Sequence, residues 1–226
     1  MCIFSWVGEE MELEVLYEDN HVIVCYKPQG VLSQGDSTGD LDMLTLVREY
    51  LKKRYNKQGN VYVGLVHRLD RMTSGVMVFA KTSKGAMRLS NDIQNGEFYK
   101  EYLAVCEGNI ENFDEVTLVD YLEKDEKLNK SFISKNGKES ILSYKVVTNK
   151  NDKCLVRVKL KTGRHHQIRV QMSNIGHPLY GDIKYGSRYK DNLALQAYKL
   201  SFYQPVSREL LTFQKISYQG VFAIFK

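Results

Sequence analysis

The chain has 226 residues, enough for one large domain with its own hydrophobic core, and its 43% hydrophobic and 26% charged residues are ordinary for a globular protein. No apolar run approaches the roughly 18 residues of a membrane-spanning helix, and the N-terminus lacks the basic start of a secretory signal. The net charge of +5 is uneven, because residues 1–20 carry six acids and no Lys or Arg and the remainder therefore carries +11. We expect a soluble, cytoplasmic protein with no membrane contact.

The first half of the chain divides into short elements with alternating or helical apolar patterns. Leu44, Val47 and Leu51 recur at the spacing of an amphipathic helix, and Ser83 is the expected N-cap of a second helix. In chain order the patterns predict two strands joined by a turn, a helix, a buried strand, another helix and a long strand: residues 13–19, 21–28, 40–54, 75–82, 83–96 and 98–108.

The second half begins with a charged, irregular stretch, residues 110–139, which predicts hairpins or a mobile loop. Two strand-like runs, 141–148 and 154–162, flank a polar stretch and predict an antiparallel hairpin. A last helix ends at Gly176 and turns three apolar residues inward: Ile168, Met172 and Ile175. The predicted fold class is α+β, with a mixed, mostly antiparallel central sheet and flanking helices.

The four cysteines, at positions 2, 25, 106 and 154, form no CxxC pair or Cys/His cluster, so neither a zinc ribbon nor a disulfide scaffold is predicted. Cys25, Cys106 and Cys154 lie in apolar strand-like runs, where a buried thiol acts as a small hydrophobic side chain. The sequence also lacks GxGxxG, Walker and HExxH motifs, which argues against a nucleotide cofactor and against zinc-dependent hydrolysis.

One segment of the second half is strongly basic. Between Lys153 and Gln171 there are six Lys or Arg residues and no acid. In the predicted strand three of these bases share the face opposite the apolar residues: Arg157, Lys159 and Lys161. Such a face suits a polyanion, because neutralising its phosphates releases counterions. A solvated strand face is the competing interpretation.

The first cluster of reactive side chains is VHRLDRMTSG, residues 66–75, between two strand-like runs. Loops held between rigid elements often carry catalytic residues. His67, Arg68 and Arg71 surround Asp70 with up to three cations, and nearby positive charge keeps a carboxylate ionised, as a nucleophile or base requires. The alternative is a surface loop with a salt-bridged aspartate.

The second cluster is TGRHHQIR, residues 162–169, at the start of the last helix. Cations at that end oppose the helix dipole by roughly 0.3–1 kcal/mol each, and a sequence that accepts this cost usually has an anionic partner. We therefore predict an ion pair between Arg169 and Asp70. His165 and His166 are adjacent and point about 100° apart on a helix, which favours RNA contact or core packing over a metal site.

In these segments the chain resembles the RluA family of RNA pseudouridine synthases. HRLDRMTSG followed by GRHHQIR is the strongest part of the resemblance. The matching stretches spread across nearly the whole chain: YEDNHVIVCYKPQG (17–30), VHRLDRMTSGVMVFAKT (66–82), YKEYLAVCEG (99–108), TGRHHQIRVQMSNIGHPLYGDIKYG (162–186) and, more weakly, LALQAYKLSFYQP (193–205). The resemblance implies an enzyme that isomerises uridines in structured RNA to pseudouridine in a central RNA-binding cleft, without cofactor or metal.

The resemblance also assigns roles to individual residues. Asp70 falls on the catalytic aspartate, and Arg169 on the arginine that holds it by an ion pair. Tyr102 falls on the tyrosine that stacks on the target base and assists proton removal, and Arg68 on the arginine that enters the RNA stack as the uridine turns out. Further RNA contacts are expected from side chains in or near the same motifs: His67, Arg71, Arg157, Lys159, Lys161, Arg164 and His165.

A base inside folded RNA must leave its stack before it can react. The Asp70 carboxylate would then attack either the anomeric carbon of the ribose or the uracil ring. Ribosomal large-subunit RNA is the favoured substrate over transfer RNA, and the protein is expected to act as a monomer. A non-catalytic RNA-binding or ribosome-assembly factor on the same fold is the alternative, and a nucleoside hydrolase, a third possibility, would release free uracil.

The resemblance also bears on domain organisation. Residues 1–13 are expected to form an acidic extension and residues 14–226 the catalytic domain. Many relatives carry a small RNA-binding domain ahead of the catalytic one, and 13 residues are too few for it. We therefore expect a stand-alone catalytic domain.

Overall fold

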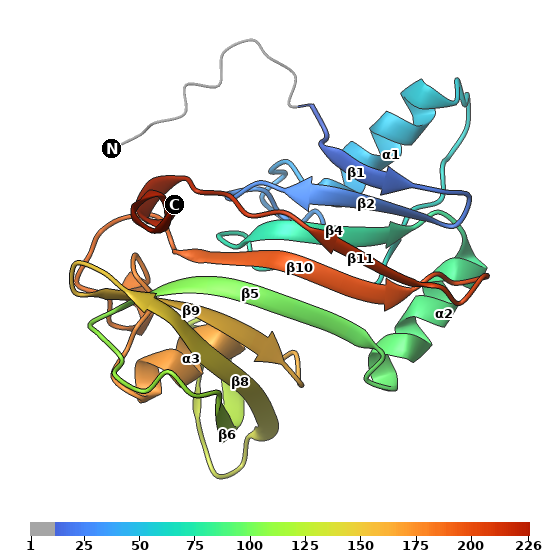
Figure 1. Ribbon diagram of the computed structural model, residues 1–226. Coiled ribbons are helices and arrows are strands. Elements are labelled where there is room, and N and C mark those ends of the chain that lie inside the picture. The colour runs from blue at the N-terminus through green and yellow to red at the C-terminus, as the bar shows by residue number, and fades with distance from the viewer. Residues whose placement is uncertain (1–11) are drawn as a thin grey trace.

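The computed structural model describes residues 12–226, which form one long sheet with helices packed on it (Figure 1). The strands are β1 (Val15–Glu18), β2 (Val22–Lys27), β3 (Gly64–Leu65), β4 (Ser74–Ala80), β5 (Phe98–Glu107), β6 (Val116–Asp125), β7 (Lys130–Ile133), β8 (Lys138–Asn149), β9 (Lys153–Leu160), β10 (Leu195–Tyr203) and β11 (Leu210–Gln214). The helices are α1 (Met43–Arg54), α2 (Ser83–Gln94), α3 (Gln167–Asn174) and two short 3-10 helices, η1 (Ile183–Tyr185) and η2 (Gly220–Phe225). All but the last two residues of the predicted acidic extension lie outside the described residues.

The sheet is mixed and mostly antiparallel, which confirms the predicted α+β class. Its strands follow the order β1-β2-β4-β10-β5-β9-β8-β6-β7, with β3 beside β4 and β11 beside β10. The β4–β10 pair is parallel, and it brings Gln196 beside Ser74. Gly75, at φ +142°, allows this approach, because a Cβ there would lie 2.3 Å from the carbonyl oxygen of Ala197. The loop before β4 and the start of β10 are therefore neighbours.

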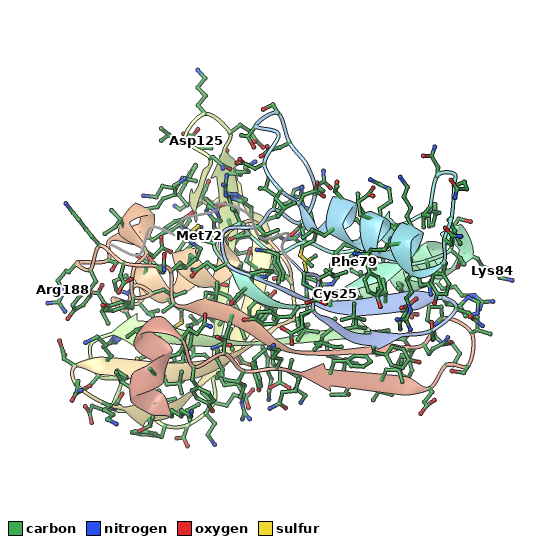
Figure 2. All side chains as sticks on the ribbon, turned by 90° about the horizontal axis from the view of Figure 1, so that it is seen from above. Cys25, Met72, Phe79, Lys84, Asp125 and Arg188 are labelled. Atoms are coloured by element: carbon green, nitrogen blue, oxygen red, sulfur yellow. The ribbon has the colours of Figure 1, made fainter. Side chains whose placement is uncertain are left out.

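The larger hydrophobic core lies on the face of the sheet that α1 and α3 cover. Met43, Val47 and Leu51 of α1 are at most 2% exposed, and they belong to the same cluster as Cys25 and Phe79 of the strands beneath, which Figure 2 labels near α1. Burying each such large apolar side chain contributes roughly 1.5–3 kcal/mol. This core fixes the strand ends from which the polar loops project.

Both long helices begin at side-chain caps. Asp42 accepts a hydrogen bond from the Thr45 amide (3.0 Å) at the start of α1. The cap of α2 is Thr82, whose hydroxyl oxygen accepts from the Gly85 amide (3.0 Å), and the predicted cap, Ser83, is the first residue of the helix instead. Ser and Thr are both favourable N-caps, so the local sequence did not distinguish between them.

The charged stretch 110–139 contains a hairpin, which is one of the two structures predicted for it. Strands β6 and β7 pair antiparallel, and Figure 2 labels Asp125 at the hairpin tip. The β8–β9 hairpin is also antiparallel, as predicted. Cys25, Cys106 and Cys154 are buried free thiols, again as predicted. No helix among residues 12–226 is long and apolar enough to cross a membrane.

Candidate active site

The loop that carries Asp70 is fastened to the rest of the fold on both sides of that residue. The Ser33 hydroxyl donates to the Leu69 carbonyl (2.7 Å) and accepts from the Leu69 amide (3.0 Å). On the other side, the Arg71 carbonyl accepts from the Lys27 ammonium (3.0 Å) and from the Gly30 amide (2.9 Å). Because the backbone is held before and after it, the Asp70 carboxylate has a defined position.

Lys27 is fully buried at the end of β2, and burial lowers the pKa of its ammonium group to about 7. In the unfolded chain a lysine has a pKa of about 10.4, so between about pH 7 and 10 the unfolded state binds more protons and stability rises with pH. We expect the free energy of unfolding, relative to that of a Lys27→Met variant, to rise by up to about 1.4 kcal/mol per pH unit in this window. Urea titrations of both chains across the window measure it, and a difference that does not vary with pH would contradict the prediction.

The Asp70 carboxylate is partly exposed and faces two side-chain nitrogen atoms. The Nη1 atom of Arg169 lies 3.7 Å from its Oδ2 atom, and the Nε2 atom of His166 lies 3.6 Å from the same oxygen. The predicted contact between Asp70 and Arg169 is therefore present. It joins the loop before β4 to the first turn of α3, nearly 100 residues later in the chain.

Arg169 has a second carboxylate partner that the sequence analysis missed. Its Nε and Nη2 atoms donate to the two carboxylate oxygens of Asp182 at 2.6 and 2.7 Å. Asp182 is almost fully buried, and the guanidinium carbon of Arg169 also lies 5.0 Å from the centre of the Tyr185 ring. A buried, bidentate pair of this kind fixes the guanidinium plane, and Arg169 reaches Asp70 with the nitrogen that remains. A buried arginine needs a buried anion, and this need could have pointed to a further carboxylate.

A pocket opens beside Asp70, and β5 supplies one of its walls. Tyr102 and Lys100 lie two residues apart on β5 and line it together. Among its described lining residues four are Lys or Arg and one is acidic: Arg68, Leu69, Asp70, Thr73, Lys100, Tyr102, Leu160, Gly163, Arg164, His166, Gln167, Ile168, Arg169 and Leu195. A cavity with this charge balance attracts an anionic ligand toward a single carboxylate.

Burial shifts the titration of the groups in this wall. It raises the pKa of the Tyr102 phenol, and the nearby Asp70 charge adds to the rise, so Tyr102 keeps its proton at neutral pH. Burial also lowers the pKa of Lys100, whose ammonium group lies 6.0 Å from the Phe98 ring centre. Lys100 is a second residue that the sequence analysis did not select, although it stands two positions before Tyr102 on the same side of a strand.

Two of the predicted RNA contacts lie on the face of the sheet opposite to Tyr102. Tyr102 is opposite Val158 in the β5–β9 register, whereas Arg157 is opposite Leu103 and Lys159 is opposite Glu101. Because side chains alternate along a strand, Arg157 and Lys159 project from the face opposite to the pocket. Lys159 also pairs with Glu115 at 3.0 Å. These two bases therefore lie away from the pocket, as a solvated strand face would, and their RNA contacts stay predictions.

His67 is a core residue, and its burial gives no support to the predicted RNA contact. Its Nε2 atom accepts a hydrogen bond from the Val78 amide (3.1 Å), and its ring packs edge-on against Phe98. Burial lowers the pKa of this imidazole to about 3, which leaves it neutral. The motif alone could not show that His67 is buried, because adjacent polar residues of the same motif differ in burial, and Arg68, next to His67, is exposed.

The other predicted contacts lie at or near the surface. Arg68 and Arg164 line the pocket, and both are exposed. Arg71 is exposed but bound to Asp40 at 2.7 Å, and Lys161 is exposed just beyond β9. His165 is half-buried, with its Nδ1 atom 2.8 Å from the Ser131 hydroxyl. Their RNA contacts stay predictions.

Several known proteins are similar to this chain in sequence. The family model described as RNA pseudouridylate synthase matches residues 21–174. The ribosomal large subunit pseudouridine synthase D of Borreliella burgdorferi is 34% identical over 198 residues, which cover 83% of this chain and 60% of that protein. The uncharacterized RNA pseudouridine synthase YlyB of Bacillus subtilis is 34% identical over 215 residues, which cover 92% of this chain and 70% of that protein. The chain thus spans between about three fifths and seven tenths of the length of these two relatives.

Solved structures share the fold. The human RNA pseudouridylate synthase domain containing 4 superimposes with a TM-score of 0.78 at 21% identity, covering 94% of this chain and 92% of the human one. The human RNA pseudouridylate synthase domain containing 1 gives a TM-score of 0.75 at 23% identity, covering 94% and 86%. At these identities the likeness concerns the arrangement of the sheet and its helices.

Proposed function

The chain belongs to the RNA pseudouridylate synthase family, and we propose that it isomerises uridines in structured RNA to pseudouridine with Asp70 as the nucleophile. The observation that carries the proposal is the position of this carboxylate. It is the acidic group of a pocket that four Lys and Arg residues line, and Arg169 lies 3.7 Å from it. Such a site draws in a phosphate backbone and presents one ionised carboxylate to the nucleoside.

The target uridine must leave the RNA stack to reach Asp70, at a cost of a few kcal/mol. Exposed Arg68 stands at the pocket two residues before Asp70, where its planar guanidinium suits the space that the uridine vacates. Exposed Arg164 also lines the pocket, in the segment that leads into α3, and suits a phosphate. These two residues replace Arg157 and Lys159 as the nearest candidate RNA anchors.

The reaction begins when an Asp70 oxygen bonds either to the anomeric carbon of the ribose or to the uracil ring. The glycosidic carbon–nitrogen bond breaks, the uracil turns within the pocket, and its C5 bonds to the anomeric carbon while the Asp70 bond is released. One proton leaves C5 and one is gained at N1, so the net change is an isomerisation. Because Tyr102 keeps its proton, stacking on the uracil is the role that its surroundings favour over proton removal by a phenolate.

Lys100 is the pocket cation whose role is simplest to test. Burial lowers its pKa, and no acidic group of residues 12–226 forms an ion pair with it, so a bound phosphate would supply the missing anion. We expect Lys100→Met to weaken RNA binding roughly tenfold and to reduce the slope of log affinity against log salt by about one. Fluorescence anisotropy with a labelled RNA over a salt series measures both quantities.

The matched control is Lys145→Met, which removes an exposed lysine of β8 opposite Arg157, on the face away from the pocket. This variant should bind RNA as the wild-type chain does. Equal losses in the two variants would mean that Lys100 acts only through the general charge of the protein.

We further propose ribosomal large-subunit RNA as the substrate, since the Borreliella relative is named for that activity. Mapping pseudouridines in ribosomal and transfer RNA from cells with and without the gene tests this. The absence of one or more ribosomal pseudouridines in the deletion strain is the expected result, and an unchanged map in both RNA classes would contradict the function. Free uracil among the products of purified enzyme would favour nucleoside hydrolysis instead. RNA binding without any modification would favour an assembly factor.

A further inference from the structure

A chain of polar contacts runs from Asp70 to the backbone of the β6–β7 hairpin. The Nε2 atom of His166 lies 3.6 Å from the Asp70 Oδ2 atom, and its Nδ1 atom lies 2.9 Å from the Tyr185 hydroxyl. That hydroxyl accepts a hydrogen bond from the backbone amide of Ser131 at 2.8 Å. Tyr185 and His166 are both buried, so each of these polar groups depends on protein partners for its hydrogen bonds.

The direction of the hydrogen bonds follows from the last donor in this series of contacts, the Ser131 amide. The Ser131 amide can only donate, so it occupies the Tyr185 oxygen as an acceptor. The Tyr185 hydrogen is then left to be donated, and the Nδ1 atom of His166 is the acceptor it faces. A neutral imidazole that accepts at Nδ1 carries its hydrogen at Nε2, the atom that faces Asp70. The opposite tautomer would leave the buried Tyr185 hydrogen without this acceptor.

The surroundings keep this imidazole neutral and hold its ring in place. Burial, followed by the charge of Arg169, lowers the pKa of His166 to about 2, and His165, Lys184 and Lys124 act in the same direction. The Asp70 carboxylate, 3.6 Å from Nε2, acts in the opposite direction and is outweighed. The His165 ring stacks on His166 at 3.7 Å, and the Tyr185 ring meets it edge-on at 5.5 Å. The backbone of His166 is left-handed, at φ +54°, a strained conformation for a non-glycine residue that the packing around it maintains.

From this geometry we propose that His166, held as the neutral Nε2–H tautomer by Tyr185, is a positioning residue that orients the Asp70 carboxylate together with Arg169. Both nitrogen donors face the Oδ2 atom of Asp70. The Oδ1 atom is therefore the oxygen left to attack the nucleoside, a consequence that rests on the proposed function. A neutral donor orients the carboxylate without adding a second positive charge beside the Arg169 guanidinium, so less of the nucleophile's charge is offset.

The tautomer is tested first, without reference to activity. Long-range proton–nitrogen NMR correlations on the full chain with nitrogen-15-labelled histidine distinguish Nε2–H from Nδ1–H imidazoles, and the spectrum of His166→Gln identifies the His166 signals. We expect a neutral Nε2–H pattern for His166 that does not change between about pH 5 and 8, the range in which an ordinary histidine titrates. In Tyr185→Phe the pattern should shift toward Nδ1–H. An Nδ1–H wild-type ring, or titration inside that range, would overturn the proposal.

The positioning role is tested second, by steady-state kinetics of pseudouridine formation. His166→Leu, which removes the donor, should lower kcat about 10- to 100-fold with little change in the KM for RNA. His166→Gln, whose amide nitrogen can reach the place of Nε2, should recover most of that loss. Equal losses in the two variants would show that His166 acts only through packing and would overturn the positioning role.

Tyr198→Phe is the control for Tyr185→Phe, because it also removes a buried tyrosine hydroxyl. The Tyr198 hydroxyl donates to the Glu101 carboxylate (2.9 Å), and neither residue lines the pocket. We expect kcat to fall in Tyr185→Phe and to stay at the wild-type value in Tyr198→Phe, with both variants folded by circular dichroism. Equal losses in these two variants would also overturn the proposal. If the wild-type chain forms no pseudouridine, the proposed function fails, and the NMR result still decides the tautomer.

Discussion

We expect Asp70→Asn to abolish pseudouridine formation while RNA binding survives. The amide has the size of the carboxylate but is neutral, and its nitrogen lone pair is delocalised into the carbonyl group, so it is too weak a nucleophile to bond to the nucleoside. The loss of a covalent nucleophile typically lowers kcat by roughly four orders of magnitude or more. Because the Asp70 side chain is 32% exposed, the substitution should leave stability within about 0.5 kcal/mol of the wild-type value. Mass spectrometry of digested RNA measures the product, and anisotropy measures the binding.

Asp114→Asn is the matched control for this experiment. Asp114 is an exposed aspartate outside the pocket lining, and the variant should modify RNA at the wild-type rate. Undiminished modification by Asp70→Asn would show that another group is the nucleophile. A loss of RNA binding that accounts for the whole fall in activity would assign Asp70 to binding rather than to chemistry.

The second large effect is expected at the buried pair of Arg169 and Asp182. Their side chains are 11% and 1% exposed, with donor–acceptor distances of 2.6 and 2.7 Å. Asp182→Ala leaves the guanidinium buried without its main anion, which should lower the free energy of unfolding by about 3–5 kcal/mol. The freed guanidinium can also turn toward Asp70 and away from its present plane, so we expect activity to fall in the same variant. Urea unfolding and the modification rate measure the two effects.

A double variant separates the structural role of the pair from its role at the site. Replacing a complete buried ion pair by apolar residues of similar size is often neutral or stabilising. Arg169→Met combined with Asp182→Leu should therefore recover most of the lost stability and yet stay inactive, because Asp70 then lacks the guanidinium that lies 3.7 Å from it. Recovery of both stability and activity would contradict the role of Arg169 in holding the nucleophile.

The sequence by itself determined the features that depend on neighbours along the chain. The strand-like runs 141–148 and 154–162 predicted the β8–β9 hairpin, and the turn between 13–19 and 21–28 predicted β1 and β2. Both predictions were possible because a hairpin needs only two adjacent apolar patterns and a polar connection. The family motifs also led to the Asp70–Arg169 contact, although these residues are distant in the chain. Single-residue details such as the cap of α2 differed, since neighbouring Thr and Ser fit equally well.

The tertiary structure decided which side of each element meets the pocket. Alternation separated the bases of β9 from its valines, but only the register with β5 turned Arg157 and Lys159 away from Tyr102. Likewise only the packing of the loop around Asp70 put His67 in the core, and only the return of the chain after α3 brought Asp182 to Arg169. Strand register and side-chain burial depend on contacts between segments far apart in sequence, and the free energy of such contacts is not encoded in any local pattern.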